Sequence, residues 1–216
     1  MKISAVIFDL DGTVLANEDE YGAAFASVLK SLGAKVTSDY PHVGGIGVEE
    51  NWPGLLKKYK IKTKKTTQEL AKQTQREYLK QLAKVHPKDG FEVFIKDLKD
   101  SEIPIALATS NEWVMLEATF EKINIEKYFD AITTGEEVAA KKPAPDLFIK
   151  AAQKLGVEPS ECLVFEDSNS GIEAALAAGM RVVAIARDED HAKSLKKAGL
   201  VIKSYWEVSP ELLWRL

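Results

Sequence analysis

Short apolar runs alternate with helical patterns along most of the chain. The first run, residues 3–8, is stopped by Asp9-Leu10-Asp11-Gly12, a pattern typical of a buried strand that enters a turn. Further strands of this kind are predicted over 103–108, 131–134, 162–165, 181–185 and 200–202. Apolar positions with a period near 3.6 predict helices over 91–98, 112–122, 145–155, 170–178 and 190–197. This alternation predicts an α/β fold with a Rossmann-like, doubly wound parallel sheet covered by helices on both faces.

Residues 16–86 depart from this alternation. They carry helical patterns over 18–32 and 67–84 and show no buried strand. A segment rich in glycine and proline, 41–54, and a lysine-rich link separate the two helices. The sequence therefore predicts a helical insert at 16–86, placed after the first strand of an α/β core that comprises 1–15 and 87–216.

Composition and charge narrow the classes of partner. Of the 216 residues, 45% are hydrophobic and 29% charged, as in ordinary globular proteins, and a formal net charge of −4 favours neither nucleic acid nor a membrane surface. Apolar stretches are too short for a signal peptide or a membrane span, and a single cysteine, Cys162, fits a reducing compartment. We therefore expect a cytoplasmic protein, with a monomer as the default. The three histidines show no metal-binding spacing, and no role is assigned to them.

The first candidate site follows the first strand. Asp9 and Asp11 directly follow the carboxyl end of this strand, and in parallel sheets ligands bind outside the carboxyl ends of the strands. Two carboxylates this close repel each other, so they invite a divalent cation or a raised pKa on one of them. An Asx turn or a helix cap explains the same residues structurally, and the pentapeptide alone does not decide between these explanations.

Three further polar groups follow other predicted strands. Thr109 and Ser110 precede a helix and are suited to bind an anion. Lys142 is followed by Pro143 and Pro145, which stiffen the backbone, and Glu166-Asp167 follows the strand at 162–165. Each group alone has a simpler explanation as a helix cap or a solvated side chain. Because four strand ends together supply acid, hydroxyl, lysine and acid, their combination predicts one magnesium and phosphate site.

These motifs, in this order, resemble those of the haloacid dehalogenase-like hydrolases, in the branch that includes phosphoglycolate phosphatase and β-phosphoglucomutase. Asp9-Leu-Asp-Gly-Thr13 resembles the first motif, Thr109-Ser110 the second, Lys142 the third and Glu166-Asp167 the fourth. The resemblance covers the whole chain and implies that the insert is a small helical cap over the active site.

The resemblance implies a mechanism for hydrolysing a small phosphorylated metabolite. Asp9 is the expected nucleophile, which forms an aspartyl phosphate, and Asp11 the acid and base. Thr109, the Ser110 backbone and Lys142 are expected to bind and neutralise the phosphoryl group. Mg²⁺ is expected on the Asp9 carboxylate, the Asp11 backbone carbonyl and Asp167, with Glu166 assisting directly or through water.

Two alternatives are a sugar phosphomutase and a catalytically silent binding protein of the same fold. Compared with β-phosphoglucomutase, the chain has Tyr21 in place of a cap histidine, Val48 in place of a phosphate-binding arginine, and Glu112 in place of a basic residue. These differences argue against a mutase, which must hold a second phosphate. Because the acids at 9, 11 and 167 are all present, the sequence argues against a silent protein as well.

Overall fold

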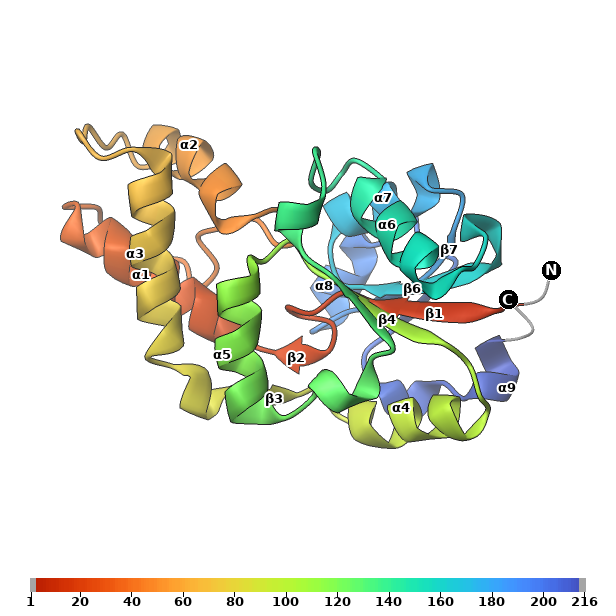
Figure 1. Cartoon of the computed structure of the whole chain (residues 1–216). Helices are drawn as coiled ribbons and strands as arrows, with labels where there is room; N and C mark the ends of the chain where they lie inside the picture. Colours follow the sequence, from red (N-terminus) through yellow and green to blue (C-terminus); the bar gives the residue numbers. More distant parts are fainter. Residues whose placement is uncertain (1–2, 214–216) are drawn as a thin grey trace.

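A six-stranded parallel sheet forms the centre of the larger lobe of the computed structural model, which describes residues 3–213 (Figure 1). Its strands are β1 (Ala5–Phe8), β4 (Ile105–Ala108), β5 (Ala131–Thr133), β6 (Cys162–Glu166), β7 (Arg181–Ile185) and β8 (Leu200–Ile202). Their order is β5-β4-β1-β6-β7-β8, so the chain runs outwards from β1 to β5 and then returns to the other side of β1. This reversal places β1 at a topological switch point, the usual ligand position in such sheets. The predicted α/β fold is confirmed.

Alternate residues of β1 face two separate hydrophobic layers. Ala5 and Ile7 face the layer under helices α6 (Asp146–Leu155) and α7 (Asn169–Ala177). Val6 and Phe8 face the opposite layer, which is covered by α4 (Phe91–Asp100), the short turn at Tyr205–Glu207 and α9 (Pro210–Leu213). In that layer the Phe8 ring is stacked on Phe165 with centroids 4.9 Å apart. Burial on both faces explains why the strands are almost continuously apolar.

Three helices make the smaller lobe, which we call the cap: α1 (Glu18–Ser31), α2 (Val48–Lys58) and α3 (Thr67–Leu79). Within the cap the fully buried Trp52 lies 5.8 Å from the Phe25 ring, and both belong to the hydrophobic cluster that continues onto the Phe8 face of the sheet. The sequence predicted two helices in the insert, whereas the structure has a third between them, α2, which begins at Val48 and contains Pro53. Burial of Trp52 and Leu55 outweighs the helix-breaking effect of that proline.

Two other predicted helices are shorter in the structure. The helix expected over 67–84 ends at Leu79 and is followed by a separate 3₁₀ turn, Leu82–Lys84. The helix expected over 190–197 is α8 (Glu189–Ser194). The helix expected over 112–122 is α5 (Trp113–Ile123), which begins one residue later than predicted. Ends of helices are set by local capping and tertiary contacts that periodicity does not reveal.

The chain crosses between the lobes twice, at adjacent positions. Strands β2 (Leu15–Ala16) and β3 (His86–Pro87) form an antiparallel pair, in which Leu15 is opposite Pro87 and Ala16 opposite His86. This pair coincides with the predicted boundaries of the insert, but the division into two domains stays a prediction. Two short crossings side by side are the arrangement that a hinge requires.

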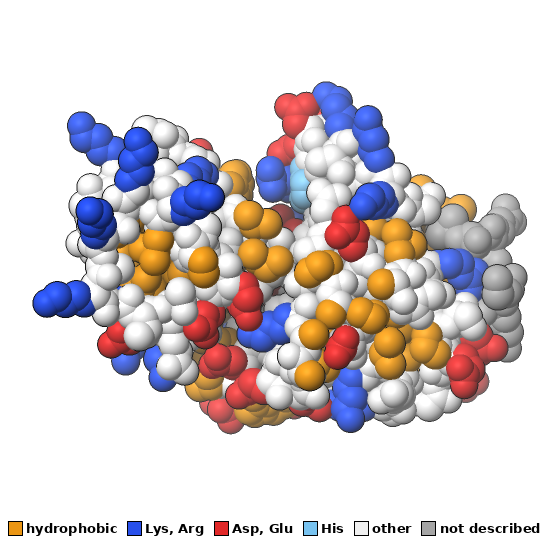
Figure 2. Space-filling view, turned by 90° about the horizontal axis from the view of Figure 1, so that it is seen from above, with side chains coloured by type: hydrophobic (Ala, Val, Ile, Leu, Met, Phe, Trp, Pro, Cys, Tyr) orange, Lys and Arg blue, Asp and Glu red, His pale blue; other side chains and the backbone are white. Residues whose placement is uncertain are grey.

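The outer surface of the cap carries many lysines. Figure 2 shows basic side chains projecting from the cap end of the molecule and an indentation between the two lobes. The lysine-rich link contributes exposed side chains at Lys57, Lys58, Lys60, Lys62, Lys64 and Lys65. Among residues 3–213, no helix has both the length and the apolar character needed to cross a bilayer.

Candidate active site

Three carboxylates meet at the carboxyl ends of β1 and β6. These strands are paired, with Phe8 opposite Phe165, so Asp9 and Glu166 continue adjacent strands at the same edge of the sheet. One carboxylate oxygen from each of Asp9, Glu166 and Asp167 lies within 4.8 Å of the others. All three residues are buried. The structure therefore brings together the acids that the sequence predicted from two separate motifs.

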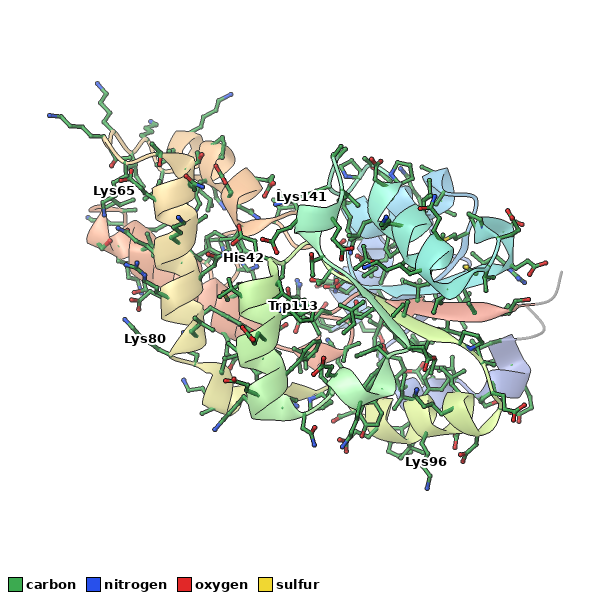
Figure 3. All side chains as sticks on the ribbon, in the orientation of Figure 1. His42, Lys65, Lys80, Lys96, Trp113 and Lys141 are labelled. Carbon is green, nitrogen blue, oxygen red and sulfur yellow. The ribbon has the colours of Figure 1, made fainter. Side chains whose placement is uncertain are left out.

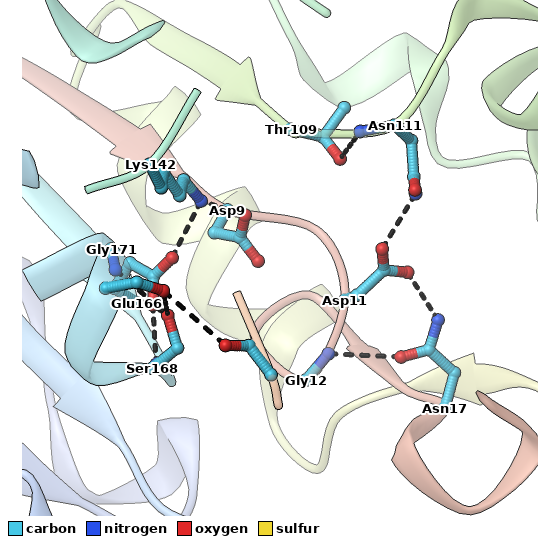
Figure 4. A network of polar contacts seen from close by, with 12 residues as sticks. Asp9, Asp11, Gly12, Asn17, Thr109, Asn111, Lys142, Glu166, Ser168 and Gly171 are labelled. Atoms are coloured by element: carbon cyan, nitrogen blue, oxygen red, sulfur yellow. Dashed lines mark hydrogen bonds and ion pairs between the residues drawn. The ribbon is translucent and has the colours of Figure 1, made fainter. Parts of the chain in front are cut away.

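Lys142 lies between two of these acids. Its ammonium group forms ion pairs with Asp9 and, at 2.7 Å, with Glu166, and the side chain is fully buried (Figure 4). The other Glu166 oxygen accepts hydrogen bonds from the Ser168 backbone N–H at 2.6 Å and from the Ser168 hydroxyl at 2.9 Å. Both Glu166 oxygens are thus occupied by protein donors, which suits a residue that holds Lys142 in place.

The charge of this cluster is unbalanced. Burial raises the pKa of Asp9 despite the opposing effect of Lys142, and burial also raises the pKa of Asp167 well above its usual range. Burial alone would lower the pKa of Lys142, but the charges of Asp9 and Glu166 outweigh burial and raise it. One ammonium cannot neutralise three ionised carboxylates, so the site needs further positive charge for Asp9 to be an anion.

The donor set fits a magnesium ion. Carboxylate oxygens are the ligands that Mg²⁺ prefers, and the buried Oδ1 atom of Asp167 has no hydrogen-bond partner among the described residues. Gly12 lies against this aspartate: a Cβ at position 12 would be 2.2 Å from Asp167 Oδ2, and the backbone φ is +77°. Asp9 and Asp167 are therefore the best-placed ligands. The Asp11 side chain lies outside the three-acid cluster, so its predicted part in metal binding rests on its backbone carbonyl and stays a prediction.

The predicted phosphate-binding residues follow β4, the strand on the other side of β1. Thr109 and Ser110 line the same cavity as Asp9. Thr109 is buried, and its hydroxyl accepts a hydrogen bond from the Asn111 backbone N–H at 3.2 Å. The buried Ser110 hydroxyl has no partner among the described residues, so it is available to an oxygen of a bound phosphoryl group.

Asp11 is held away from Lys142 by two amides. Its Oδ1 accepts a hydrogen bond from Asn17 Nδ2 at 2.6 Å, and its Oδ2 accepts one from Asn111 Nδ2 at 2.7 Å (Figure 4). Burial raises the pKa of Asp11 to about 6, although both amide hydrogen bonds lower it. A carboxyl group with a pKa near neutrality can both give and take a proton at physiological pH.

The cavity at these residues has a volume of about 60 Å³ and is lined by both the core and the cap. Its cap side is formed by α1, by the loop before α2 and by the first turn of α2, with these lining residues: Glu18, Tyr21, Phe25, His42, Val43, Gly44, Gly45, Ile46, Val48 and Asn51. The loop is pinned by Asn51, whose side chain accepts from the Val43 N–H at 2.7 Å and donates to the Val43 carbonyl at 3.0 Å. The glycine-rich loop therefore faces the cavity.

Sequence reasoning missed three residues of this site. No role was assigned to His42, but its ring is stacked on Phe25 with centroids 4.7 Å apart and its buried Nδ1 atom has no partner among the described residues. Figure 3 shows His42 on the cap side of the cleft. Asn17 and Asn111 lay next to recognised motifs, but only the fold shows that both contact Asp11. A polar residue beside each motif was the available signal.

Comparisons with known proteins find similar chains over almost the whole length of this one. Residues 6–185 match the model of the haloacid dehalogenase-like hydrolase family. A phosphorylated carbohydrates phosphatase from Thermotoga maritima is 32% identical over 206 residues, covering 92% of this chain and 93% of the relative. A β-phosphoglucomutase from Bacillus subtilis is 30% identical, with 98% of this chain and 94% of the relative covered. The crystal structure of an HAD hydrolase, family IA, variant 3, from Entamoeba histolytica superposes with a TM-score of 0.85 at 28% identity, covering 100% of this chain and 98% of that one.

Proposed function

Because the chain belongs to the haloacid dehalogenase-like hydrolase family, we propose that it is a Mg²⁺-dependent phosphatase of small phosphomonoesters that works through an aspartyl phosphate on Asp9. The observation that carries this proposal is the buried cluster of Asp9, Lys142, Glu166 and Asp167 at the switch point of the sheet. The family and the enzyme class, a phosphoric monoester hydrolase, are as the sequence predicted.

The proposed reaction has two steps. In the first, an Asp9 oxygen attacks phosphorus, the bond from phosphorus to the leaving oxygen breaks, and the Asp11 carboxyl group gives that oxygen its proton. In the second, water attacks the phosphorus of the aspartyl phosphate and Asp11 takes the proton of that water. The bond between phosphorus and Asp9 breaks, which releases phosphate and restores the Asp9 carboxylate and the protonated Asp11 carboxyl group.

Other residues stabilise charge during these steps. Lys142 lies beside Asp9, and Thr109 with the unpartnered Ser110 hydroxyl lines the cavity, so these groups are placed to neutralise the phosphoryl oxygens. Mg²⁺ bound by Asp9 and Asp167 would supply the positive charge that the cluster lacks and orient the phosphate. Glu166 acts by holding Lys142.

The cavity favours a leaving group without a second phosphate. Of the described residues that line it, none is lysine or arginine, and Tyr21 and Val48 both face it. Glu112, which replaces the third basic residue, is exposed and lies outside this lining. A phosphomutase must bind a second phosphate there, so the second candidate, a mutase like the Bacillus relative, rests on sequence similarity alone.

Phosphate release from a panel of phosphorylated metabolites, with Mg²⁺ or with EDTA, tests this function. We expect release only with Mg²⁺, fastest with small monophosphates of uncharged alcohols, and none from the Asp9→Asn variant. Asp9→Asn provides the matched control because it keeps the size of the side chain. Folded wild-type protein that releases no phosphate from any ester would contradict the proposal and favour a binding protein. The monomeric, cytoplasmic state stays a prediction.

A further inference from the structure

Asp11 belongs to a closed ring of five side chains that joins the core to the cap. From Asp11 the ring runs to Asn17, whose Nδ2 atom also donates to the Tyr78 hydroxyl at 2.7 Å. The Tyr78 ring is stacked on Tyr21 with centroids 3.9 Å apart and an interplanar angle of 12°. The Tyr21 hydroxyl donates to Asn111 Oδ1 at 3.3 Å, and Asn111 returns to Asp11. Asp11 and Asn111 belong to the core, whereas the two tyrosines come from cap helices α1 and α3.

Asn17 is the buried anchor of this ring. It precedes α1, but its side chain makes no capping hydrogen bond to that helix. Its Oδ1 instead accepts from the Gly12 N–H at 3.1 Å, and because an N–H group only donates, this contact fixes which end of the amide faces Asp11. Both amide hydrogens are then used, one by Asp11 and one by Tyr78. Asn17 is fully buried, and its amide oxygen and both amide hydrogens have partners. These contacts, rather than capping of α1, account for an asparagine at this position.

Asn111 occupies the opposite side of the carboxylate and lines the cavity. Its Nδ2 atom binds the second Asp11 oxygen at 2.7 Å, while its link to the Tyr21 hydroxyl is longer, at 3.3 Å. Asn111 is also less buried than Asn17. A leaving oxygen that takes a proton from Asp11 must approach the carboxyl group from the cavity, so Asn111 is the neighbour that holds Asp11 on the side of that approach.

We propose that Asn17 and Asn111 are positioning residues that hold the Asp11 carboxyl group in line with the leaving group, and that Tyr21 and Tyr78 hold these asparagines only while the cap is docked. This inference rests on the proposed function, because it assigns a role for the same acid and base. It links closure of the cap to proton transfer, since the ring is complete only when α1 and α3 lie against the core. Both tyrosines are buried, which keeps water from competing for these hydrogen bonds.

Two esters that differ in their need for an acid test this inference. The leaving group of 4-nitrophenyl phosphate is stable as an anion, whereas an alkyl phosphate requires a proton from Asp11. The alkyl ester is the one that the wild type hydrolyses fastest in the panel. For Asn111→Ala with Mg²⁺, we expect kcat/KM for this ester to fall at least about tenfold more than kcat/KM for 4-nitrophenyl phosphate. General acid catalysis is worth roughly 10²- to 10⁴-fold, which sets the upper limit of the difference.

Tyr78→Phe is the matched second variant. It keeps the ring stacked on Tyr21 and removes only the hydroxyl that binds Asn17, so it should fold and should shift the ratio of the two kcat/KM values in the same direction by a smaller factor. Phosphoenzyme trapped during turnover of 4-nitrophenyl phosphate should accumulate in both variants, because Asp11 also activates the water. A structural defect would produce neither effect.

Equal losses on both esters, or no loss on either, would overturn the inference while leaving the phosphatase itself intact. A wild-type protein that hydrolyses neither ester would overturn the proposed function first, and this inference with it. The two failures are therefore distinguished by the wild-type measurement.

Discussion

Replacing Gly171 with alanine tests how closely the Glu166 carboxylate is packed against α7. A Cβ atom at position 171 would lie 1.8 Å from Glu166 Oε1, 2.0 Å from its Cδ and 2.5 Å from Oε2. Gly171 is helical and carries no positive φ, so alanine would otherwise stabilise α7 by about 0.5–1 kcal/mol. The clash opposes this gain, because carboxylate and helix backbone are both buried.

The size of the effect follows from the displacement. Non-bonded atoms need a separation of roughly 3.5 Å, so the carboxylate must move by about 1.5 Å and lose its contacts with Lys142 and Ser168. Hydrogen bonds to charged groups contribute about 1.5–3 kcal/mol each, which exceeds the gain in helix propensity. A misplacement of about 1 Å near the reacting atoms can lower the rate by about 10²-fold, or about 2.7 kcal/mol.

Steady-state kcat/KM with saturating Mg²⁺ and urea unfolding measure the two consequences. For Gly171→Ala we expect kcat/KM about 100-fold below wild type and a lower free energy of unfolding. Gly54→Ala is the matched control: it also lies within a helix, but its Cβ would meet nothing within 4 Å. A Gly171→Ala variant with wild-type kcat/KM and stability would refute the role assigned to Glu166 as the support of Lys142.

Three further predictions concern charge and the cap loop. In EDTA, the free energy of unfolding should fall as the pH rises from 6.5 to 8.5, because burial raises the folded-state pKa of Asp9 to about 8 and the folded protein therefore binds a proton that the unfolded chain has lost. Mg²⁺ should stabilise the protein more at pH 8.5 than at pH 6.5. A free energy of unfolding that rises with pH in EDTA would contradict this prediction. Gly45→Ala should raise KM strongly, because its Cβ would lie 1.8 Å from the Ser168 hydroxyl and the backbone φ at this position is +78°. Gly44→Ala is the control, because its Cβ would meet nothing within 4 Å, and its KM should change much less. Equal KM values in the two variants would argue against docking of the cap loop on Ser168. His42→Phe keeps an aromatic ring but removes the Nδ1 atom that has no partner among the described residues. We therefore expect a higher KM for hydroxylated substrates with kcat retained. If the order of KM values across the substrate panel stayed the same, His42 would have no part in substrate recognition.

The strands and the candidate site residues at their ends could be predicted because each depends on local sequence. A buried parallel strand is an apolar run, and polar residues directly after it must lie at one edge of the sheet. β7 and β8 have the predicted bounds, and the acids from two motifs, Asp9 and Asp167, meet as expected. The resemblance to a known family added the roles, which the site geometry supports without testing them.

What the sequence did not reveal depends on packing between distant segments. Helix α2 was missed because Pro53 and Gly54 are poor helix formers, while the burial of Trp52 that outweighs them depends on Phe25 from another helix. Asn17 and Asn111 are 94 positions apart in the sequence, and only the fold of the chain shows that both contact Asp11.

Trapping of the phosphoenzyme tests the central claim most directly. Wild-type protein is mixed with Mg²⁺ and its best ester, quenched in acid, treated with borohydride and analysed by peptide mass spectrometry. The account predicts modification of the aspartate at position 9, dependent on both ester and Mg²⁺, and none in the Asp9→Asn variant. Full turnover by Asp9→Asn, or a phosphoryl group trapped on a different residue of the wild type, would contradict it.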